Sequence, residues 1–123
     1  MVMVLWEEYM SDRKILVVDD NESTRNVLSR QLALLNHHPV PVNDGLKAIE
    51  MMATSDFHMV LLDINMPNMN GIDVLRSING HRNETPVLMV SGLRSADVVK
   101  QALRDGAYDY IMKPWSIDEL RAA

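Results

Sequence analysis

Short apolar runs alternate along this chain with longer segments in which apolar residues recur at helical spacing. Each run reads as a strand, and each is followed by a polar turn and an amphipathic helix. The expected strands are 15–18, 38–42, 59–62, 87–90 and 107–112, and the expected helices follow Asn21 or Ser23, Asp44-Gly45, Asn70-Gly71, Ser95 and Ser116. This strict alternation predicts an α/β domain in which a parallel sheet carries helices on both faces.

The composition of the strands predicts their order in the sheet. Segments 15–18, 59–62 and 87–90 are uninterrupted apolar runs, as expected for strands buried on both faces. Segment 38–42 carries two prolines, which are largely confined to edge strands because proline cannot donate to the ladder. Segment 107–112 is mixed in polarity and suits the opposite edge. The order 2-1-3-4-5 follows, which is that of a flavodoxin-like (βα)5 three-layer sandwich with its switch point between strands one and three.

Length and composition limit the function. The 123 residues suffice for one domain, and the formal charge of -5 comes without any basic patch that could hold a nucleic acid backbone. The absence of cysteine excludes a disulfide framework, a thiolate zinc site and a cysteine nucleophile. No apolar run approaches the roughly 20 residues of a membrane span, and the N-terminus does not resemble a signal peptide. We expect a cytoplasmic protein without membrane or nucleic acid contacts.

Charged and polar residues stand at the ends of several expected strands. Asp19 and Asp20 follow the first, Asp63 follows the third, Ser91 ends the fourth and Lys113 follows the fifth. The carboxyl ends of parallel strands meet at one edge of a sheet, so these side chains are expected to share a pocket. Three carboxylates at close range repel each other strongly, so the arrangement requires raised pKa values or a bound cation. A donor set of oxygens favours Mg²⁺ over zinc. A cation, a lysine and a hydroxyl would together surround a phosphoryl group.

These residues lie in ordered motifs that resemble the receiver domain of two-component response regulators. The resemblance runs from about Lys14 to the C-terminus and rests on four segments: Val17-Val18-Asp19-Asp20, 61–67 with Gly71, Val90-Ser91-Gly92, and Asp105-Gly106-Ala107 leading to Lys113-Pro114. It implies that Asp63 accepts a phosphoryl group from a histidine kinase or a histidine phosphotransfer protein.

The resemblance also implies a role for each neighbour of Asp63. Asp20, Asp63 and the backbone carbonyl of Asn65 would bind Mg²⁺, or Mn²⁺ in its place, with Asp19 acting mainly through water. Lys113 would pair with Asp63 or its phosphoryl group. The peptide bond between Lys113 and Pro114 would be cis.

Switching is implied by the same family. Ser91 and the aromatic Tyr110 would move inward on phosphorylation and change the surface formed by the fourth helix, the fifth strand and the fifth helix. That surface is also where the family would form a homodimer. The domain is then a phosphorylatable signalling module, not an enzyme, although it assists its own phosphorylation and slow autodephosphorylation. Leu93, two residues after Ser91, occupies a position associated with the rate of phosphoryl loss, and an apolar side chain there is expected to slow it.

Three other functions were weighed against this interpretation. A haloacid-dehalogenase-type phosphatase needs a second acid two residues after its nucleophile, where this chain has Asn65. A flavodoxin-like electron carrier would place its flavin phosphate against the acidic loop 19–22, which would repel it. A pseudo-receiver that acts only as an interaction module normally lacks part of the acid, hydroxyl and lysine set, which is complete here; it stays as the alternative.

The two ends of the chain suggest further expectations. Residues 1–12 read as an N-terminal extension before a receiver domain at 13–123. The codons for residues 6–10 can contain the purine-rich sequence GGAGG just before Met10, which would be a ribosome-binding region translated from a mis-assigned start. The rival interpretation is an amphipathic arm that uses Val4, Leu5 and Trp6 to contact a partner. The fifth helix looks truncated, so we expect a C-terminal effector domain outside this chain.

Overall fold

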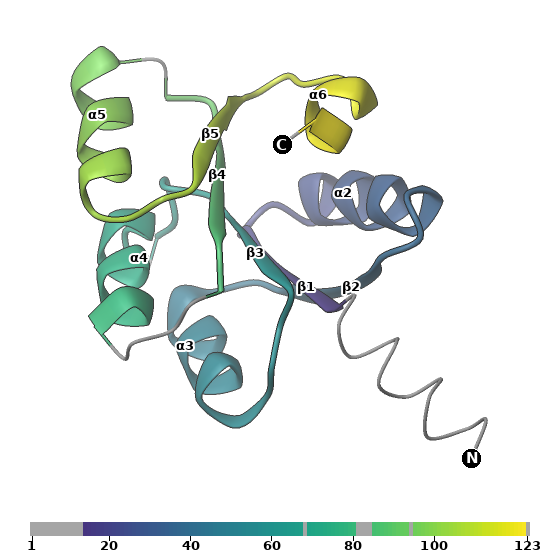
Figure 1. Ribbon diagram of the computed structural model, residues 1–123, viewed down its shortest axis with the longest axis horizontal. Helices are drawn as coiled ribbons and strands as arrows, with labels where there is room; N and C mark the ends of the chain where they lie inside the picture. The colour runs from purple at the N-terminus through teal and green to yellow at the C-terminus, as the bar shows by residue number, and fades with distance from the viewer. Residues whose placement is uncertain (1–13, 68, 81–84, 94, 123) are drawn as a thin grey trace.

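A computed structural model describes residues 14–67, 69–80, 85–93 and 95–122. Strands and helices alternate along the chain, labelled as in Figure 1. The strands are β1 (Lys14–Val18), β2 (His38–Val42), β3 (Met59–Leu62), β4 (Val87–Ser91) and β5 (Asp109–Met112). The helices are α2 (Glu22–Leu34), α3 (Gly45–Thr54), α4 (Gly71–Gly80), α5 (Ala96–Arg104) and α6 (Ile117–Ala122). The expected extension at 1–12 lies outside the described residues.

The five strands form one parallel sheet in the order β2-β1-β3-β4-β5, which confirms the predicted flavodoxin-like topology. The strand with two prolines, β2, lies at one edge as expected. β1 pairs with β3 so that Val18 lies opposite Leu62. The next residues, Asp19 and Asp63, therefore leave the sheet side by side.

Two apolar clusters fill the space between the sheet and its helices. Helices α3, α4 and α5 cover one face, and α2 and α6 cover the other (Figure 1). Alternate residues of β1 belong to different clusters, since Leu16 and Val18 pack on the first face and Ile15 and Val17 on the second. The central strands are thus buried on both sides, as their uninterrupted apolar sequences predict.

Side-chain oxygens cap several helices where the sequence predicts a start. Asn21 Oδ1 accepts a hydrogen bond from the Thr24 amide at 3.0 Å, and Asp44 Oδ1 accepts one from the Lys47 amide at 2.7 Å. Ser116 Oγ accepts from the Glu119 amide. Of the two candidates for α2, Asn21 is the cap. Ser95 occupies the cap position of α5, but the described residues show no hydrogen bond from its side chain to the helix.

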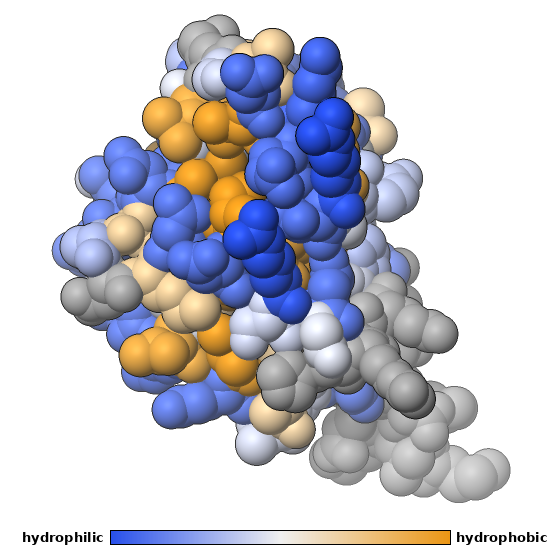
Figure 2. Space-filling view, turned by 90° about the vertical axis from the view of Figure 1, so that its left-hand side faces the viewer, coloured by the Kyte–Doolittle hydropathy of each residue, from blue (hydrophilic) through white to orange (hydrophobic). Residues whose placement is uncertain are grey.

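Several apolar helix residues that match the helical spacing are nevertheless exposed. Leu46, at 61% exposure, faces solvent beside the fully buried Ala48, and Leu103, at 45%, does so beside Ala102. Residues one or two positions apart on a helix point in different directions and cannot both face the sheet, and the smaller side chain takes the inner position in each case. Figure 2 shows the side of α3, α4 and α5, where hydrophobic side chains stand between hydrophilic ones.

The fifth strand is shorter than expected, because it begins at Asp109 and not at Ala107. The Ala107 amide donates to the Ala102 carbonyl at 3.0 Å, so this residue closes the end of α5. Gly106 precedes it with φ of 104°, a conformation that favours glycine. The predicted end of the helix at Gly106 is confirmed. Within the described residues, no helix has both the length and the apolar sequence needed to cross a bilayer.

Candidate functional site

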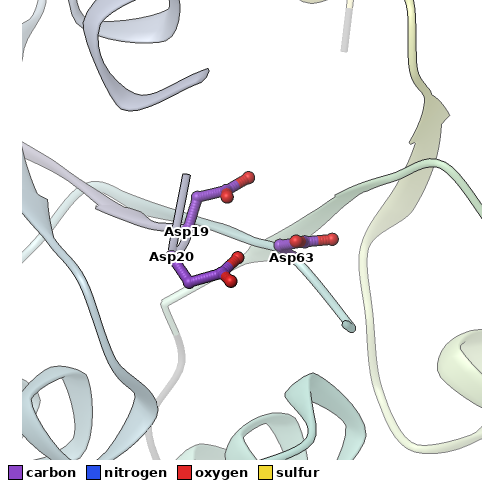
Figure 3. Close-up of side chains that lie close together, drawn as sticks. All are labelled: Asp19, Asp20 and Asp63. Carbon is purple, nitrogen blue, oxygen red and sulfur yellow. The ribbon is translucent and has the colours of Figure 1, made fainter. Parts of the chain in front are cut away.

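Three carboxylates from two neighbouring strand ends gather at the carboxyl edge of the sheet (Figure 3). Asp19 and Asp20 follow β1 and Asp63 follows β3, and one carboxylate oxygen from each lies within 4.8 Å of the others. Asp19 and Asp63 are buried, whereas Asp20 is exposed. The structure therefore brings together the acidic cluster that the strand ends predict.

Asp19 is held by protein groups at each of its polar atoms. Its Oδ2 accepts from Lys113 Nζ at 2.9 Å and its Oδ1 from the Asn21 amide at 2.9 Å. Its own amide donates to the Val42 carbonyl at 3.3 Å, and its carbonyl accepts from Arg25 Nη1 at 2.8 Å. Both carboxylate oxygens of Asp19 are therefore already engaged in hydrogen bonds within the protein.

Asp63 differs from Asp19 because one of its oxygens is left open. Its Oδ2 lies 3.5 Å from Lys113 Nζ, but its buried Oδ1 has no hydrogen-bond partner among the described residues. Burial raises the pKa of Asp63, and the charge of Asp19 raises it further. Lys113, the Asn65 backbone amide and the Ser91 hydroxyl lower this pKa, but they do not outweigh burial. The carboxyl group of Asp63 is therefore harder to ionise in this site than that of an exposed aspartate.

Lys113 supplies the positive charge of this pocket from the far edge of the sheet. Burial by itself lowers the pKa of its ammonium group, but the hydrogen bond to Asp19 and the charge of Asp63 raise the pKa above its ordinary value of 10.5. The ammonium group is thus firmly charged at neutral pH. The Lys113–Pro114 bond is cis, as expected.

Ser91 and Tyr110 lie beside the acidic cluster and are linked through Leu93. Ser91 is fully buried, and its Oγ accepts a hydrogen bond from the Leu93 amide at 3.3 Å. The Tyr110 hydroxyl donates to the Leu93 carbonyl at 2.7 Å. Burial raises the pKa of Tyr110; the Ser91 hydroxyl lowers it and the charge of Asp63 adds to the rise. The side chains of both predicted switch residues therefore form hydrogen bonds with the backbone of Leu93, in the loop after β4.

The loop after β3 is held close to the sheet by Gly71. The Gly71 amide donates to the Ile64 carbonyl at 2.7 Å. A Cβ atom at this position would collide with the carbonyl oxygen of Asp63, so only glycine allows this approach. Asn65 lies in the same loop and is exposed, with its backbone amide near the Asp63 carboxylate. This close approach holds the start of α4 against the backbone of Asp63 and Ile64.

The cluster fits a hard divalent cation. It offers oxygen donors only, from the buried carboxylate of Asp63 and the exposed carboxylate of Asp20. Burial and the charge of Asp19 raise the pKa of Asp63, and a cation bound beside it would favour the ionised carboxylate. Mg²⁺ commonly binds through one or two carboxylates and keeps several waters, which suits a site open on the side of Asp20.

Sequence reasoning missed Arg25, whose side chain reaches the Asp19 carbonyl. A signal for it exists in retrospect. Arg25 lies in the first turn of a helix capped by Asn21, and helical side chains point toward the N-terminus of their helix, here toward β1. Its charge type alone could not show whether it bonds a carboxylate, a carbonyl or solvent.

The chain resembles known proteins over nearly its whole length. The sequence profile described as the response regulator receiver domain matches residues 15–123. Regulatory protein AtoC of Escherichia coli (strain K12) is 37% identical over 107 residues, which are 87% of this chain and 23% of AtoC. Response regulator MprA of Mycobacterium tuberculosis (strain ATCC 25177 / H37Ra) is 33% identical over 109 residues, which are 89% of this chain and 47% of MprA.

The fold has close counterparts among solved structures as well. A CheX-CheY-BeF3-Mg+2 complex from Borrelia burgdorferi matches with a TM-score of 0.85 and 28% identity, covering 89% of this chain and 84% of that chain. The chain spans less than half the length of the two sequence relatives above. From its sequence, its fold and its acidic site, the chain belongs to the response regulator receiver domain family.

Proposed function

We propose that this chain takes a phosphoryl group onto Asp63 from a phosphohistidine of a histidine kinase or a histidine phosphotransfer protein. The single observation that carries the proposal is the buried Asp63 carboxylate, whose Oδ1 has no hydrogen-bond partner among the described residues and whose Oδ2 lies 3.5 Å from Lys113 Nζ. A carboxylate oxygen without a hydrogen bond is available as a nucleophile. In the transfer, a P–O bond forms to Asp63 as the P–N bond to the donor imidazole breaks.

Asp20 and Asp63 would hold Mg²⁺ directly, or Mn²⁺ in its place, with the carbonyl of Asn65 as a further ligand. Asp19 would act through water, because both of its carboxylate oxygens already accept hydrogen bonds from the protein. When bound, the cation would neutralise charge that develops on the phosphoryl oxygens. The solved relative from Borrelia burgdorferi contains BeF3 and Mg2+, which supports this choice of ion.

Lys113 and Ser91 would stabilise the phosphorylated state from the side opposite the cation. Lys113 Nζ already lies 3.5 Å from Asp63 Oδ2 and can turn to a phosphoryl oxygen. Ser91 would release the Leu93 amide and donate its hydroxyl proton to another phosphoryl oxygen. The Tyr110 hydroxyl donates a hydrogen bond to the Leu93 carbonyl. Movement of the loop that holds Leu93 would therefore change the position of Tyr110 and the shape of the surface formed by α5, β5 and α6.

We expect the partner that recognises this surface to be an effector domain outside this chain. AtoC and MprA are considerably longer than the segment matched here, which supports an effector domain after the receiver domain. The surface of α5, β5 and α6 is also our candidate for a homodimer contact. A cytoplasmic location is typical of the family, and we expect it here, with a histidine kinase or a histidine phosphotransfer protein as the phosphodonor and no contact with nucleic acid or membrane.

Phosphorylation of the purified protein tests this function. Incubation with Mg²⁺ and acetyl phosphate, a small phosphodonor, is expected to add the mass of one phosphoryl group, and hydroxylamine should remove it as expected for an acyl phosphate. Intact-protein mass spectrometry measures both steps. Beryllofluoride with Mg²⁺ should perturb the NMR spectrum of the same sample without covalent change.

The controls separate the acceptor from the ion. Asp63→Asn should gain no mass and should not respond to beryllofluoride, while wild type with a chelator should react far more slowly. If wild type gains no mass and gives no beryllofluoride response, Asp63 is not an acceptor and the chain acts only as an interaction module.

Leu93 offers a test of the phosphoryl lifetime. Its side chain is 37% exposed, and its backbone bonds both Ser91 and Tyr110. An apolar side chain cannot orient an attacking water, so Leu93→Glu is expected to shorten the half-life of phosphorylated Asp63, by roughly tenfold if the carboxylate acts as a general base. Release of inorganic phosphate after removal of acetyl phosphate measures the half-life. Equal half-lives for Leu93→Glu, wild type and a Leu93→Gln control would contradict this role.

A further inference from the structure

The side chain of Arg25 crosses from α2 back to the end of β1. Its backbone amide donates to the Asn21 carbonyl at 3.0 Å in the first helical turn, and its Nη1 donates to the Asp19 carbonyl at 2.8 Å. Asp19 is only 1% exposed. A buried carbonyl without a partner destabilises a fold, so the guanidinium group satisfies an acceptor that water reaches poorly.

The charge of Arg25 is used in an unexpected way. Asp19 belongs to a cluster of three carboxylates, yet the bond that Arg25 makes to Asp19 goes to its neutral carbonyl. An arginine that served only to balance charge would be expected to bond a carboxylate, where a charge-assisted pair is stronger. The contact made here instead fixes the main chain at the point where β1 ends.

Asp20 depends on that main chain. Its carboxylate is exposed, and it makes no hydrogen bond to another residue in the described part of the chain. Its place is therefore set by its two neighbours, Asp19 and Asn21. Asp19 is bonded to Val42 through its amide and to Arg25 through its carbonyl, and Asn21 caps α2.

We propose that Arg25 is a positioning residue for the metal site, which holds the turn 19–21 so that the Asp20 carboxylate faces Asp63. The proposal rests on the proposed function, in that Asp20 and Asp63 bind the cation. Groups outside the ligand shell that orient ligands typically change metal affinity by ten- to a hundredfold when they are removed. The affinity for Mg²⁺ is therefore the quantity that Arg25 controls.

The sign of the effect separates positioning from simple electrostatics. Removal of a positive charge near a cation site strengthens cation binding by Coulomb's law alone. Loss of a positioning contact weakens it, because Asp20 then samples arrangements that do not face Asp63. We expect Arg25→Met to raise the Kd for Mg²⁺ by about tenfold or more.

Titration of Mg²⁺ alone into the full chain, followed by NMR or calorimetry, tests the proposal without any phosphodonor. Arg30→Met is the matched control, because Arg30 is an exposed residue of the same helix and its removal makes the same change in net charge. Arg30→Met should bind Mg²⁺ as wild type does. Arg25→Lys, which keeps the charge and one donor, should bind more tightly than Arg25→Met.

Clear outcomes overturn the idea. A Kd for Arg25→Met equal to or lower than that of Arg30→Met removes the positioning role. Should Arg25→Met fail to fold by circular dichroism, Arg25→Gln is compared with Arg30→Gln, which makes the same change in charge: a higher Kd for Arg25→Gln supports positioning, and an equal one overturns it. Failure of wild type to bind Mg²⁺ would instead count against the proposed function, so the two hypotheses fail by different measurements.

Discussion

Replacement of Gly71 by alanine is expected to lower the free energy of unfolding by roughly 3 kcal/mol or more, the upper range for overpacking a tight site. The added Cβ atom would collide with the carbonyl oxygen of Asp63 and come within 2.6 Å of the Ile64 Cα. Both atoms belong to the main chain at the end of β3, so no side chain can turn away to relieve the contact. Urea unfolding followed by circular dichroism measures the change.

A second glycine of the same helix provides the control. A Cβ atom at Gly80 would meet nothing within 4 Å among the described residues. Gly80→Ala is therefore expected to be neutral or to stabilise the fold, by up to about 1 kcal/mol, because alanine loses less backbone entropy in a helix. Similar unfolding curves for the two variants would show that the loop 63–71 can move away from α4.

Removal of the Lys113 charge should have the second large effect. Lys113→Met is expected to destabilise the metal-free protein at pH 7 by about 2 kcal/mol, less than the full effect of breaking a buried ion pair because the ammonium group is partly exposed. The lysine lies 2.9 Å from Asp19 Oδ2 and 3.5 Å from Asp63 Oδ2, and both carboxylates are buried. Without it, the buried carboxylates of Asp19 and Asp63 have no ion-pair partner in the described part of the chain and repel each other. Urea unfolding in a chelating buffer measures the loss.

The effect of Lys113→Met should depend on pH in a defined direction. Its contribution requires ionised carboxylates, so the difference from wild type should shrink as pH falls toward 3.8, the ordinary pKa of an aspartate. Because the pKa of Lys113 is raised in the folded state, its stabilisation is complete below 10.5 and is lost as pH rises through that raised value. The difference should therefore be widest across the neutral range.

Asp63→Asn completes a double-mutant cycle with Lys113→Met. Burial raises the pKa of Asp63, so its ionised form opposes folding at pH 7 and the neutral amide should restore part of the stability lost with Lys113. We expect a coupling of about 1 kcal/mol between the two positions. Strictly additive effects would show that Lys113 stabilises the fold through Asp19 alone.

The fold could be predicted from local sequence because each element carries its own signal. Pro39 and Pro41 place β2 at an edge, and the apolar runs of β1, β3 and β4 place those strands inside. The acidic cluster followed from the same signals, since strand order alone puts Asp19 next to Asp63.

Other features depend on packing that no local pattern encodes. The spacing of Leu46 and Leu103 matches a buried helix face, but Ala48 and Ala102 take the inner positions. The contact of Arg25 with a carbonyl depends on the rotamer of one long side chain against the end of β1. The unpartnered Oδ1 of Asp63 is likewise a property of the assembled pocket.

The ion pair between Lys113 and Asp19 joins groups that are 94 residues apart in the chain. During synthesis the three aspartates leave the ribosome well before the lysine, and β5, which carries it to the site, is the last strand of the sheet to be made. A chain released before β5 is made would hold the three aspartates without the ammonium group that pairs with two of them. The charge balance of the acidic cluster is therefore completed only when the last strand of the described sheet has joined β4.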